Sequence, residues 1–436
     1  MCTVRLAEVW YNSAVMGKWY KWSMLAMLSG AFFFHQADRA LFGLLTIPIQ
    51  KELGLTDVEI GWINTALSWT LAGMAFLAGP VGDRFSRKWI ITLSLLSWSF
   101  MTFMMGFVGT WTICGLVLPA FWVVLFFRSI ATGVGESFYT PCYPALIAAF
   151  HTKTRSIALS IHQGALYFGL MSSGIITAWA LGVLGTWRHV FMAFGGAGFL
   201  LGLYFAVALK DAPSGSVSTE RRKEGLFAGF ACFFRTPSAL LAMAGFIAIV
   251  FVNNAYLFWA PKYMAMKFDM SIGAAGSMAM LWHHLFAFGA IMLCGWLTDH
   301  FVQNRPRFRL GLQIGALLFG VPCLLMIGHG ETVVAVIAMT SAYGLCRGAF
   351  EVNTHASLFD VIPPQHRSTA VGIFTVFAFF VGGLSGVLMG ALSQHAGVKG
   401  FEYGFALMAA AYGLAALLML ISFFRTFAKD RIHEEG

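Results

Sequence analysis

Twelve long apolar stretches fill most of this chain, and each is long enough to cross a lipid bilayer as a helix. The hydrocarbon core is about 30 Å thick and needs roughly 20 helical residues. Backbone groups in lipid must be satisfied within their own segment, so we predict α-helices. The predicted spans are 22–49, 57–80, 88–109, 116–149, 156–182, 189–209, 237–262, 272–297, 308–328, 332–361, 368–392 and 400–424. With only 11% charged residues, the chain is expected to be an all-α membrane protein.

The distribution of basic residues predicts how these helices are oriented. Twenty of the 28 Lys and Arg residues fall in the termini and in the loops after every second span, whereas five fall in the alternate loops. This bias follows the positive-inside rule and places both termini in the cytoplasm. The formal charge of +9 therefore orients the protein and indicates no nucleic-acid partner. Short loops and the lack of an N-x-[ST] sequon favour a bacterial plasma membrane (the inner membrane).

The chain divides into two similar halves. Gly79 and Asp83 after the second span recur as Gly295 and Asp299 after the eighth, 216 positions later. A polar segment lies between the halves, with six spans on either side, which is typical of a parallel repeat. The predicted parts are a tail at 1–21, a bundle at 22–209, a linker at 210–236, a bundle at 237–424 and a tail at 425–436.

The loop after the second span resembles the signature loop of the major facilitator superfamily, and the resemblance covers the whole chain. It implies twelve transmembrane helices in two pseudo-symmetric six-helix bundles that rock about a shared site. It also implies a gate at the cytoplasmic surface, with Asp83 at a helix N-terminus, where negative charge is favoured. The alternative is that the loop only enforces topology. The predicted gate residues are Gly79, Asp83, Arg84, Arg87, Lys88, Arg155, Gly295, Asp299 and Arg367.

Charged residues inside the first and fourth spans are the main candidates for a site, since an ionisable group at membrane depth is costly. His35 and Arg39 share one helical face in the first span, with Asp38 beside them. Arg39 is expected to contact an anion because its planar fork matches a carboxylate; the alternative is a self-neutralised pair with Asp38. Arg128 and Glu136 lie about 12 Å apart along the fourth span and cannot pair directly. Glu136, aided by Asp38, is the predicted proton carrier, with an interhelical ion pair as the alternative.

The second half offers a further set of polar candidates. The tenth span contains three polar residues at i, i+4 and i+8, namely Arg347, Glu351 and His355. At this spacing Arg347 and Glu351 either neutralise each other or contact substrate. Glu351 is also a further proton-coupling candidate. Amides in the seventh span are expected to bind hydroxyl groups. The predicted substrate-binding residues are His35, Arg39, Arg128, Asn253, Asn254, Tyr256, Arg347, Asn353 and His355. The spacing of the histidines does not favour a metal site.

Two subfamilies share parts of this pattern. The chain resembles the anion:cation symporters, which include sugar-acid and sialin-like carriers, at Asp38, Arg39, Arg128 and Glu136. It also resembles the spinster-like lipid carriers, at residues 133–139 and at the Asp38-Arg39 pair. The first resemblance implies arginines on the substrate and acids on protons. The sequence has no nucleotide-binding loop and no catalytic constellation, so we expect a secondary transporter and not an enzyme.

The predicted function is proton-coupled symport of a small organic anion such as a hexonate or hexuronate. The alternative is export of a lysolipid or another amphiphilic solute. No cofactor is expected, because the proton gradient supplies the energy. The expected partners are the anionic substrate, protons and the lipid bilayer, and the protein is expected to be a monomer.

Overall fold

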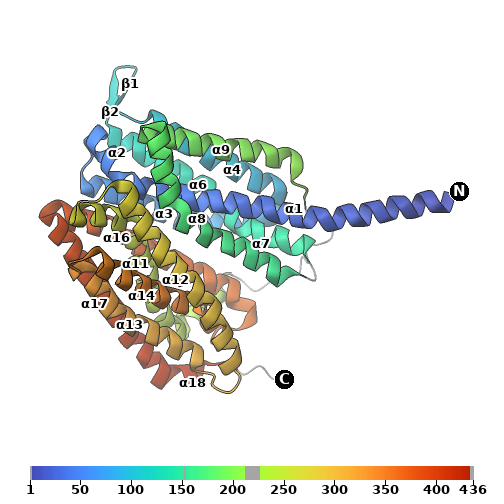
Figure 1. Ribbon diagram of the computed structural model, residues 1–436. Coiled ribbons are helices and arrows are strands. Elements are labelled where there is room, and N and C mark those ends of the chain that lie inside the picture. Colours follow the sequence, from blue (N-terminus) through green and yellow to red (C-terminus); the bar gives the residue numbers. More distant parts are fainter. Residues whose placement is uncertain (1, 152–153, 212–225, 433–436) are drawn as a thin grey trace.

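The computed structural model describes residues 2–151, 154–211 and 226–432, and it is almost entirely helical. Figure 1 shows two bundles, the first half of the chain above and the second half below. The first bundle contains α1 (Cys2–Leu44), α2 (Thr46–Leu53), α3 (Asp57–Arg84), α4 (Arg87–Met104), η1 (Met105–Phe107), α5 (Ala120–Val124), the π-helical η2 (Leu125–Ala131), α6 (Thr132–Ser137), α7 (Tyr139–Phe150), α8 (Arg155–Leu184) and α9 (Trp187–Ala208).

The second bundle repeats this plan. It contains α11 (Pro237–Phe268), α12 (Ile272–Phe301), α13 (Phe308–His329), α14 (Val333–Glu351), α15 (Thr354–Phe359), η3 (Pro364–His366), α16 (Arg367–Ala396), α17 (Val398–Ile421), the π-helical η4 (Ser422–Thr426) and α18 (Phe427–Asp430). Among the described residues, 10 helical spans are long and apolar enough to cross a membrane by length and composition. Together with α1 and α3 they form the predicted twelve-helix, all-α architecture.

The structure departs from the predicted spans before the fourth helix. The span predicted to begin at 116 starts as a strand, because β1 (Trp111–Ile113) and β2 (Leu116–Leu118) form an antiparallel hairpin and the helix begins only at Ala120. Cys114 and Gly115 have positive φ angles of 50° and 82°. Two such residues in succession are typical of a tight hairpin turn that matches the twist of its strands.

The predicted tails and linker also contain more helix than expected. α1 begins at Cys2 and runs without a break into the first span, so the predicted tail at 1–21 is helical as far as the structure describes it. The predicted linker contains α10 (Leu226–Arg235), which packs on α16 through Phe233 and Phe374, whose ring centroids are 6.2 Å apart. Residues 212–225 lie outside the described part.

Side chains fix the helix ends in the connecting loops. Thr56 caps α3 by accepting a hydrogen bond from the Glu59 amide, and the Glu59 carboxylate accepts one from the Thr56 amide. In the same region Arg188 Nε donates to Glu52 across 2.7 Å, which ties α2 to α9. This hydrogen bond lowers the pKa of Glu52 below its usual value.

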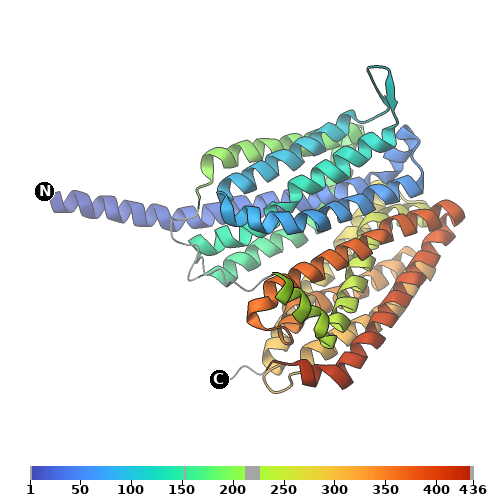
Figure 2. The ribbon, with the colours of Figure 1, turned by 180° about the vertical axis from the view of Figure 1, so that it is seen from behind.

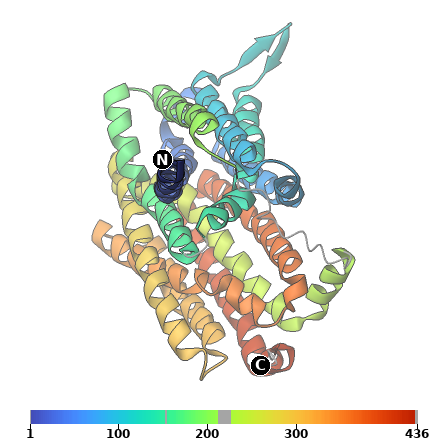
Figure 3. The same cartoon turned by 90° about the vertical axis from the view of Figure 1, so that its right-hand side faces the viewer.

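The two halves meet at one end of the molecule. Both chain termini lie at one end, named here the terminal side, and Figure 3 looks at the molecule from there. The opposite end, the far side, carries α2 and the hairpin (Figure 1). Hydrogen bonds join the far-side parts of α3 and α16, for example from Thr65 Oγ1 to Gly383 O across 2.8 Å and from Trp69 Nε1 to Phe380 O across 2.8 Å.

The second contact between the halves is between α8 and α12. A Cβ at Gly174 would lie 2.6 Å from the backbone carbonyl of Gly276, so the two helices are in backbone contact there. Towards the terminal side the two bundles diverge, as Figures 1 and 2 show from opposite directions. The molecule is therefore closed on its far side.

Candidate functional site

A cavity of about 550 Å³ lies between the two halves, on the terminal side of their contacts. The first half contributes six polar side chains to its wall: Gln36, Arg39, Asn64, Ser68, Arg128 and Gln163. The second half contributes six more: Asn253, Asn254, Arg347, Glu351, Thr354 and His355. The cavity therefore contains seven of the residues predicted from sequence to bind substrate or protons.

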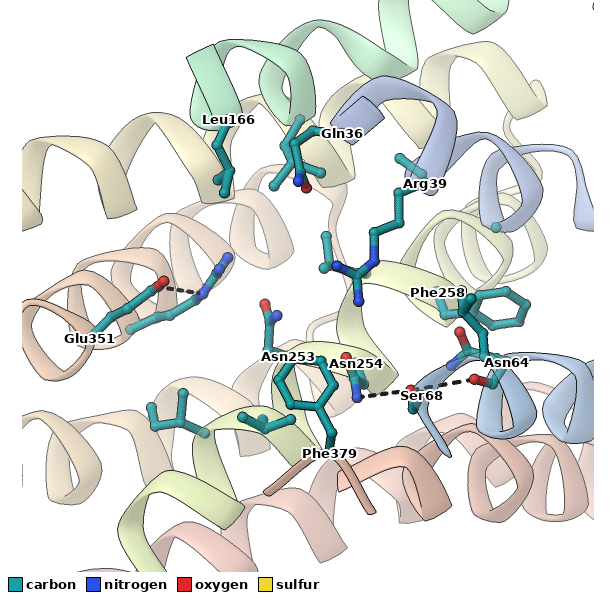
Figure 4. Close-up of a pocket in the computed structure, with 18 of the residues that line it drawn as sticks. Gln36, Arg39, Asn64, Ser68, Leu166, Asn253, Asn254, Phe258, Glu351 and Phe379 are labelled. Atoms are coloured by element: carbon teal, nitrogen blue, oxygen red, sulfur yellow. Dashed lines mark hydrogen bonds and ion pairs between the residues drawn. The ribbon is translucent and has the colours of Figure 1, made fainter. Parts of the chain in front are cut away.

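Arg39 and Arg128 form a cationic wall on the side of the first half. The Arg39 side chain extends from α1 into the cavity (Figure 4). Arg128 is 5% exposed, its Nη2 donates to the backbone carbonyl of Arg39 across 2.9 Å, and its guanidinium lies over the ring of Phe42. Neither arginine forms an ion pair with a carboxylate within the described part of the chain. Guanidinium groups that are not engaged in an ion pair offer a planar fork to a carboxylate, so this wall is suited to an anionic ligand.

Arg347 and Glu351 form an ion pair on the opposite side of the cavity. Arg347 Nε lies 3.3 Å from Glu351 Oε2, and Arg347 Nη1 lies 3.2 Å from His283 Nε2. Glu351 Oε2 also accepts a hydrogen bond of 3.2 Å from Tyr167 of the first half. The i, i+4 neutralisation considered from the sequence is therefore present, and it includes a contact across the two halves.

Amide side chains lie between the cationic wall and this ion pair. Figure 4 shows Asn253 and Asn254 below the cavity, with Asn64 and Ser68 beside them. Asn254 Nδ2 donates to Ser68 Oγ across 3.4 Å, again between the halves. Amides supply both donors and acceptors, so they can bind hydroxyl groups.

Two of the three predicted proton carriers, Asp38 and Glu136, lie behind the cavity wall, whereas Glu351 lines the cavity. Asp38 is 6% exposed and accepts a hydrogen bond of 2.8 Å from Thr102 on α4. Glu136 is 2% exposed, and its Oε2 lies 3.2 Å from His35 Nε2. His35 was expected to bind substrate, but it too lies inside the first bundle.

A short polar chain connects this interior to the cavity. Gln36 lines the cavity, and its Nε2 lies 3.1 Å from His35 Nδ1. A histidine that accepts at Nδ1 carries its proton on Nε2, which is the atom next to Glu136. The order from cavity to acid is therefore Gln36, His35 and Glu136.

Two other predicted substrate-binding residues do not reach the cavity. Tyr256 is 1% exposed and donates a hydrogen bond of 2.8 Å to Ala279 O on α12. Asn353 precedes α15 and is 2% exposed, and its side-chain amide lies 3.5 Å from Ala349 O in the last turn of α14. Both side chains pack inside the second bundle and do not line the cavity, so the geometry does not support a substrate contact for either.

The predicted gate loop has a different local geometry from the one expected. Asp83 lies in the last turn of α3 and not at a helix N-terminus; Ser86 is the residue that caps α4, accepting from the Trp89 amide. The side chains of Asp83 and Arg84 lie outside the described residues. Arg87 is the first residue of α4, and the Lys88 amide lies 3.5 Å from Asp211 Oδ1.

The remaining predicted gate residues lie on the terminal side. Gly295 and Asp299 occupy the end of α12 as Gly79 and Asp83 occupy the end of α3, and Asp299 is exposed. Arg155 is exposed at the start of α8. Arg367 donates to the carbonyls of Ile362 and Phe359 and so holds the loop of its own half.

Sequence analysis missed a polar cluster that joins the halves on the far side. Lys262 is 8% exposed and pairs with Asp57, and its Nζ also donates to Gln50 Oε1 across 2.7 Å. Ser393 of α16 donates to the second oxygen of Asp57. The sequence placed Lys262 at a span end and gave no sign of its partner, which is 205 positions away.

The comparisons with known proteins agree with this architecture. The Major Facilitator Superfamily profile matches residues 27–317 and 308–435. The "Probable galactarate/D-glucarate transporter GarP" of Escherichia coli (strain K12) is 27% identical over 371 residues, covering 78% of this chain and 81% of that protein. "Protein spinster homolog 1" of Xenopus tropicalis is 26% identical over 234 residues, covering 52% of this chain and 42% of that protein.

A solved structure shares the fold. A bacterial homolog of the human lysosomal transporter Spinster, in an inward-facing and unoccupied conformation, superposes with a TM-score of 0.81 at 20% identity, covering 95% of this chain and 99% of that one. At this identity the likeness concerns the fold alone.

No group of three or more His, Cys, Asp or Glu side chains that could hold a metal occurs within the described ranges.

Proposed function

This chain belongs to the Major Facilitator Superfamily and is a transporter, and we propose that it carries a small organic anion of the sugar-acid type in symport with protons. The observation that supports this proposal is the cationic wall of Arg39 and Arg128. The amides beside that wall suit the hydroxyl groups of a sugar acid. The name of the galactarate/D-glucarate relative points to the same class of cargo.

The balance of buried charges supports proton coupling. Three acids, Asp38, Glu136 and Glu351, match the three arginines of the cavity wall in number, so the formal charges of these six side chains cancel. An entering carboxylate would leave one uncompensated negative charge, and one proton would remove it. Moving a bare charge through the membrane field costs about 2.3 kcal/mol per 100 mV, so neutral cargo crosses more easily.

We assign the proton to Glu136, with Asp38 as its neighbour. His35 Nε2 lies 3.2 Å from Glu136 Oε2, so this imidazole can exchange a proton with the acid, while the cavity-lining Gln36 contacts the other ring nitrogen. Glu351, a further candidate from the sequence, lies 3.3 Å from Arg347 and is already paired with a cation.

Transport into proteoliposomes tests this proposal. Purified protein in vesicles with an alkaline interior should accumulate a radiolabelled hexonate, hexuronate or hexarate, and the uptake should collapse when a protonophore removes the pH gradient. Glu136→Gln should lose gradient-driven accumulation and retain exchange of labelled for unlabelled substrate across the membrane. Glu331→Gln, which removes an exposed acid from the α13–α14 loop, is the matched control and should behave as the parent protein.

The alternative cargo gives a different result in the same vesicles. If no sugar acid moves and the protein releases a lysolipid instead, the proposal is wrong and the spinster-like assignment replaces it. Loss of both accumulation and exchange in Glu136→Gln would place this acid in binding or folding and not in proton coupling. We further propose a bacterial plasma-membrane location, cytoplasmic termini and a monomeric state, which the basic loops and the closed two-bundle architecture support.

A further inference from the structure

We propose that the cargo carries one carboxylate and a polyol end, and that Glu351 excludes acids with a carboxylate at both ends. This inference rests on the proposed function and narrows it. The two ends of the cavity differ in charge, because Arg39 lies on one side and Glu351 on the other (Figure 4). Arg128 contacts the Arg39 carbonyl, and Arg347 pairs with Glu351. A site with one cationic end and one neutral end fits a monocarboxylate.

The cationic end is open to a ligand. Arg39 points into the cavity, and Arg128 uses one guanidinium nitrogen on the Arg39 carbonyl. Neither is paired with a described carboxylate. A carboxylate at this position would gain charge-assisted hydrogen bonds from a planar fork.

The other end is suited to hydroxyl groups. Both contacts of the Glu351 carboxylate, from Arg347 and from Tyr167, reach Oε2, so Oε1 has no partner among the described residues. A carboxylate oxygen accepts hydrogen bonds and donates none when ionised, so a hydroxyl is its natural ligand. Asn253 and Asn254 lie between this oxygen and the cationic end, where they can bind further hydroxyls.

A second carboxylate would meet Glu351 and not a free cation. Arg347 is the only arginine that lines the cavity from the second half, within the described residues, and it is already paired. Juxtaposed like charges disfavour binding, and specificity between similar ligands often depends on such a repulsive element. Glu351 therefore acts as a specificity-determining residue and not as a proton carrier.

A matched pair of six-carbon acids tests this inference. Galactonate and galactarate share a carbon skeleton and differ at C6, which is a hydroxymethyl group in the first and a carboxylate in the second. The parent protein should transport galactonate with a kcat/KM at least about tenfold higher, which corresponds to about 1.4 kcal/mol. Glu351→Gln should lower that ratio about tenfold or more, because it removes the repulsion and frees Arg347 for the second carboxylate.

Tyr167→Phe is the matched control, because it removes the other contact to Glu351 and leaves the charge of Glu351 in place. This variant should keep the preference for galactonate.

Competition on the parent protein gives a second readout if Glu351→Gln does not insert into the membrane. Unlabelled galactonate should inhibit uptake of labelled substrate at a lower concentration than galactarate does. Equal or better transport of galactarate by the parent protein would overturn this inference and leave the sugar-acid function intact. Transport of no hexonate, hexuronate or hexarate at all would instead contradict the proposed function.

Discussion

Asp38 and Arg39 are neighbours in the chain but have different surroundings. Successive side chains on an α-helix point about 100° apart, so one can face the cavity while the next faces the bundle interior. Arg39 lines the cavity, whereas Asp38 accepts a hydrogen bond from Thr102 on α4. The two therefore do not neutralise each other locally, and the position of Arg39 is best explained by an anionic cargo.

Arg39 variants test that explanation. We expect Arg39→Gln to weaken sugar-acid binding roughly tenfold to a hundredfold, since a hydrogen bond to a charged group contributes about 1.5–3 kcal/mol. Arg39→Lys should recover only part of the affinity, because an ammonium keeps the charge and loses the planar fork. The measurement is calorimetric binding to detergent-purified protein.

Lys399→Gln serves as the control for Arg39→Gln, because it removes an exposed cation from the start of α17. Its affinity should equal that of the parent protein. An unchanged dissociation constant in Arg39→Gln would show that the substrate carboxylate binds elsewhere.

Sequence spacing gave the relative direction of side chains on one helix but not their direction in the molecule. The i, i+4 rule predicted that Arg347 and Glu351 meet, and they do. It could not predict that Asn253 faces the cavity while Tyr256, three positions later, faces α12, because that depends on how α11 is rotated against its neighbours. Helix rotation is set by packing between distant segments.

The contact between α3 and α16 depends on small residues at the scale of helices. A Cβ at Gly61 would lie 2.6 Å from Gly386 O and 2.7 Å from Val387 Cα, and these are backbone atoms that cannot rotate away. Small residues let helix backbones approach closely in membranes. The far-side closure therefore requires glycine at this position.

Gly61→Ala should push α3 from α16 and shift the protein away from the far-side-closed conformation. The expected result is a longer distance between spin labels at Lys51 and Asp269, two exposed far-side positions on opposite halves, measured by electron–electron double resonance. Gly73→Ala is the control on the same helix, because a Cβ there meets nothing within 4 Å. Identical distance distributions for Gly61→Ala and Gly73→Ala would contradict this role.

The helices themselves were predictable because length and apolarity follow directly from crossing a bilayer. Segments outside the bilayer were harder to predict, as α10 and the β1–β2 hairpin show. Apolar residues in these segments resemble part of a span in a hydropathy plot. Cys114 and Gly115 were a local sign of a turn, and only their positive φ angles establish it.

The whole molecule is held closed on one side by the contacts of α3 with α16 and of α8 with α12. The duplicated halves were evident from the repeated Gly and Asp residues of their loops, but the conformation was not. Two arrangements of the same bundles share one sequence, and their energies differ by only a few kcal/mol in such proteins. The cluster around Asp57 and Lys262 adds an ion pair to the far-side contacts between the halves.

Breaking this cluster should change the conformational equilibrium more than the fold. Asp57→Asn leaves the Lys262 ammonium buried without its carboxylate, and removing one partner of a buried pair costs about 3–5 kcal/mol. A cost of about 3 kcal/mol in the closed state alone changes the ratio of conformers by roughly a hundredfold. We expect the distance between spin labels at Lys51 and Asp269 to lengthen in Asp57→Asn. Adding Lys262→Gln should restore part of the closed population, because it removes the buried ammonium that has lost its carboxylate. If Asp57→Asn changes neither the distances nor the exchange rate, other contacts between α3 and α16 must hold the far side closed.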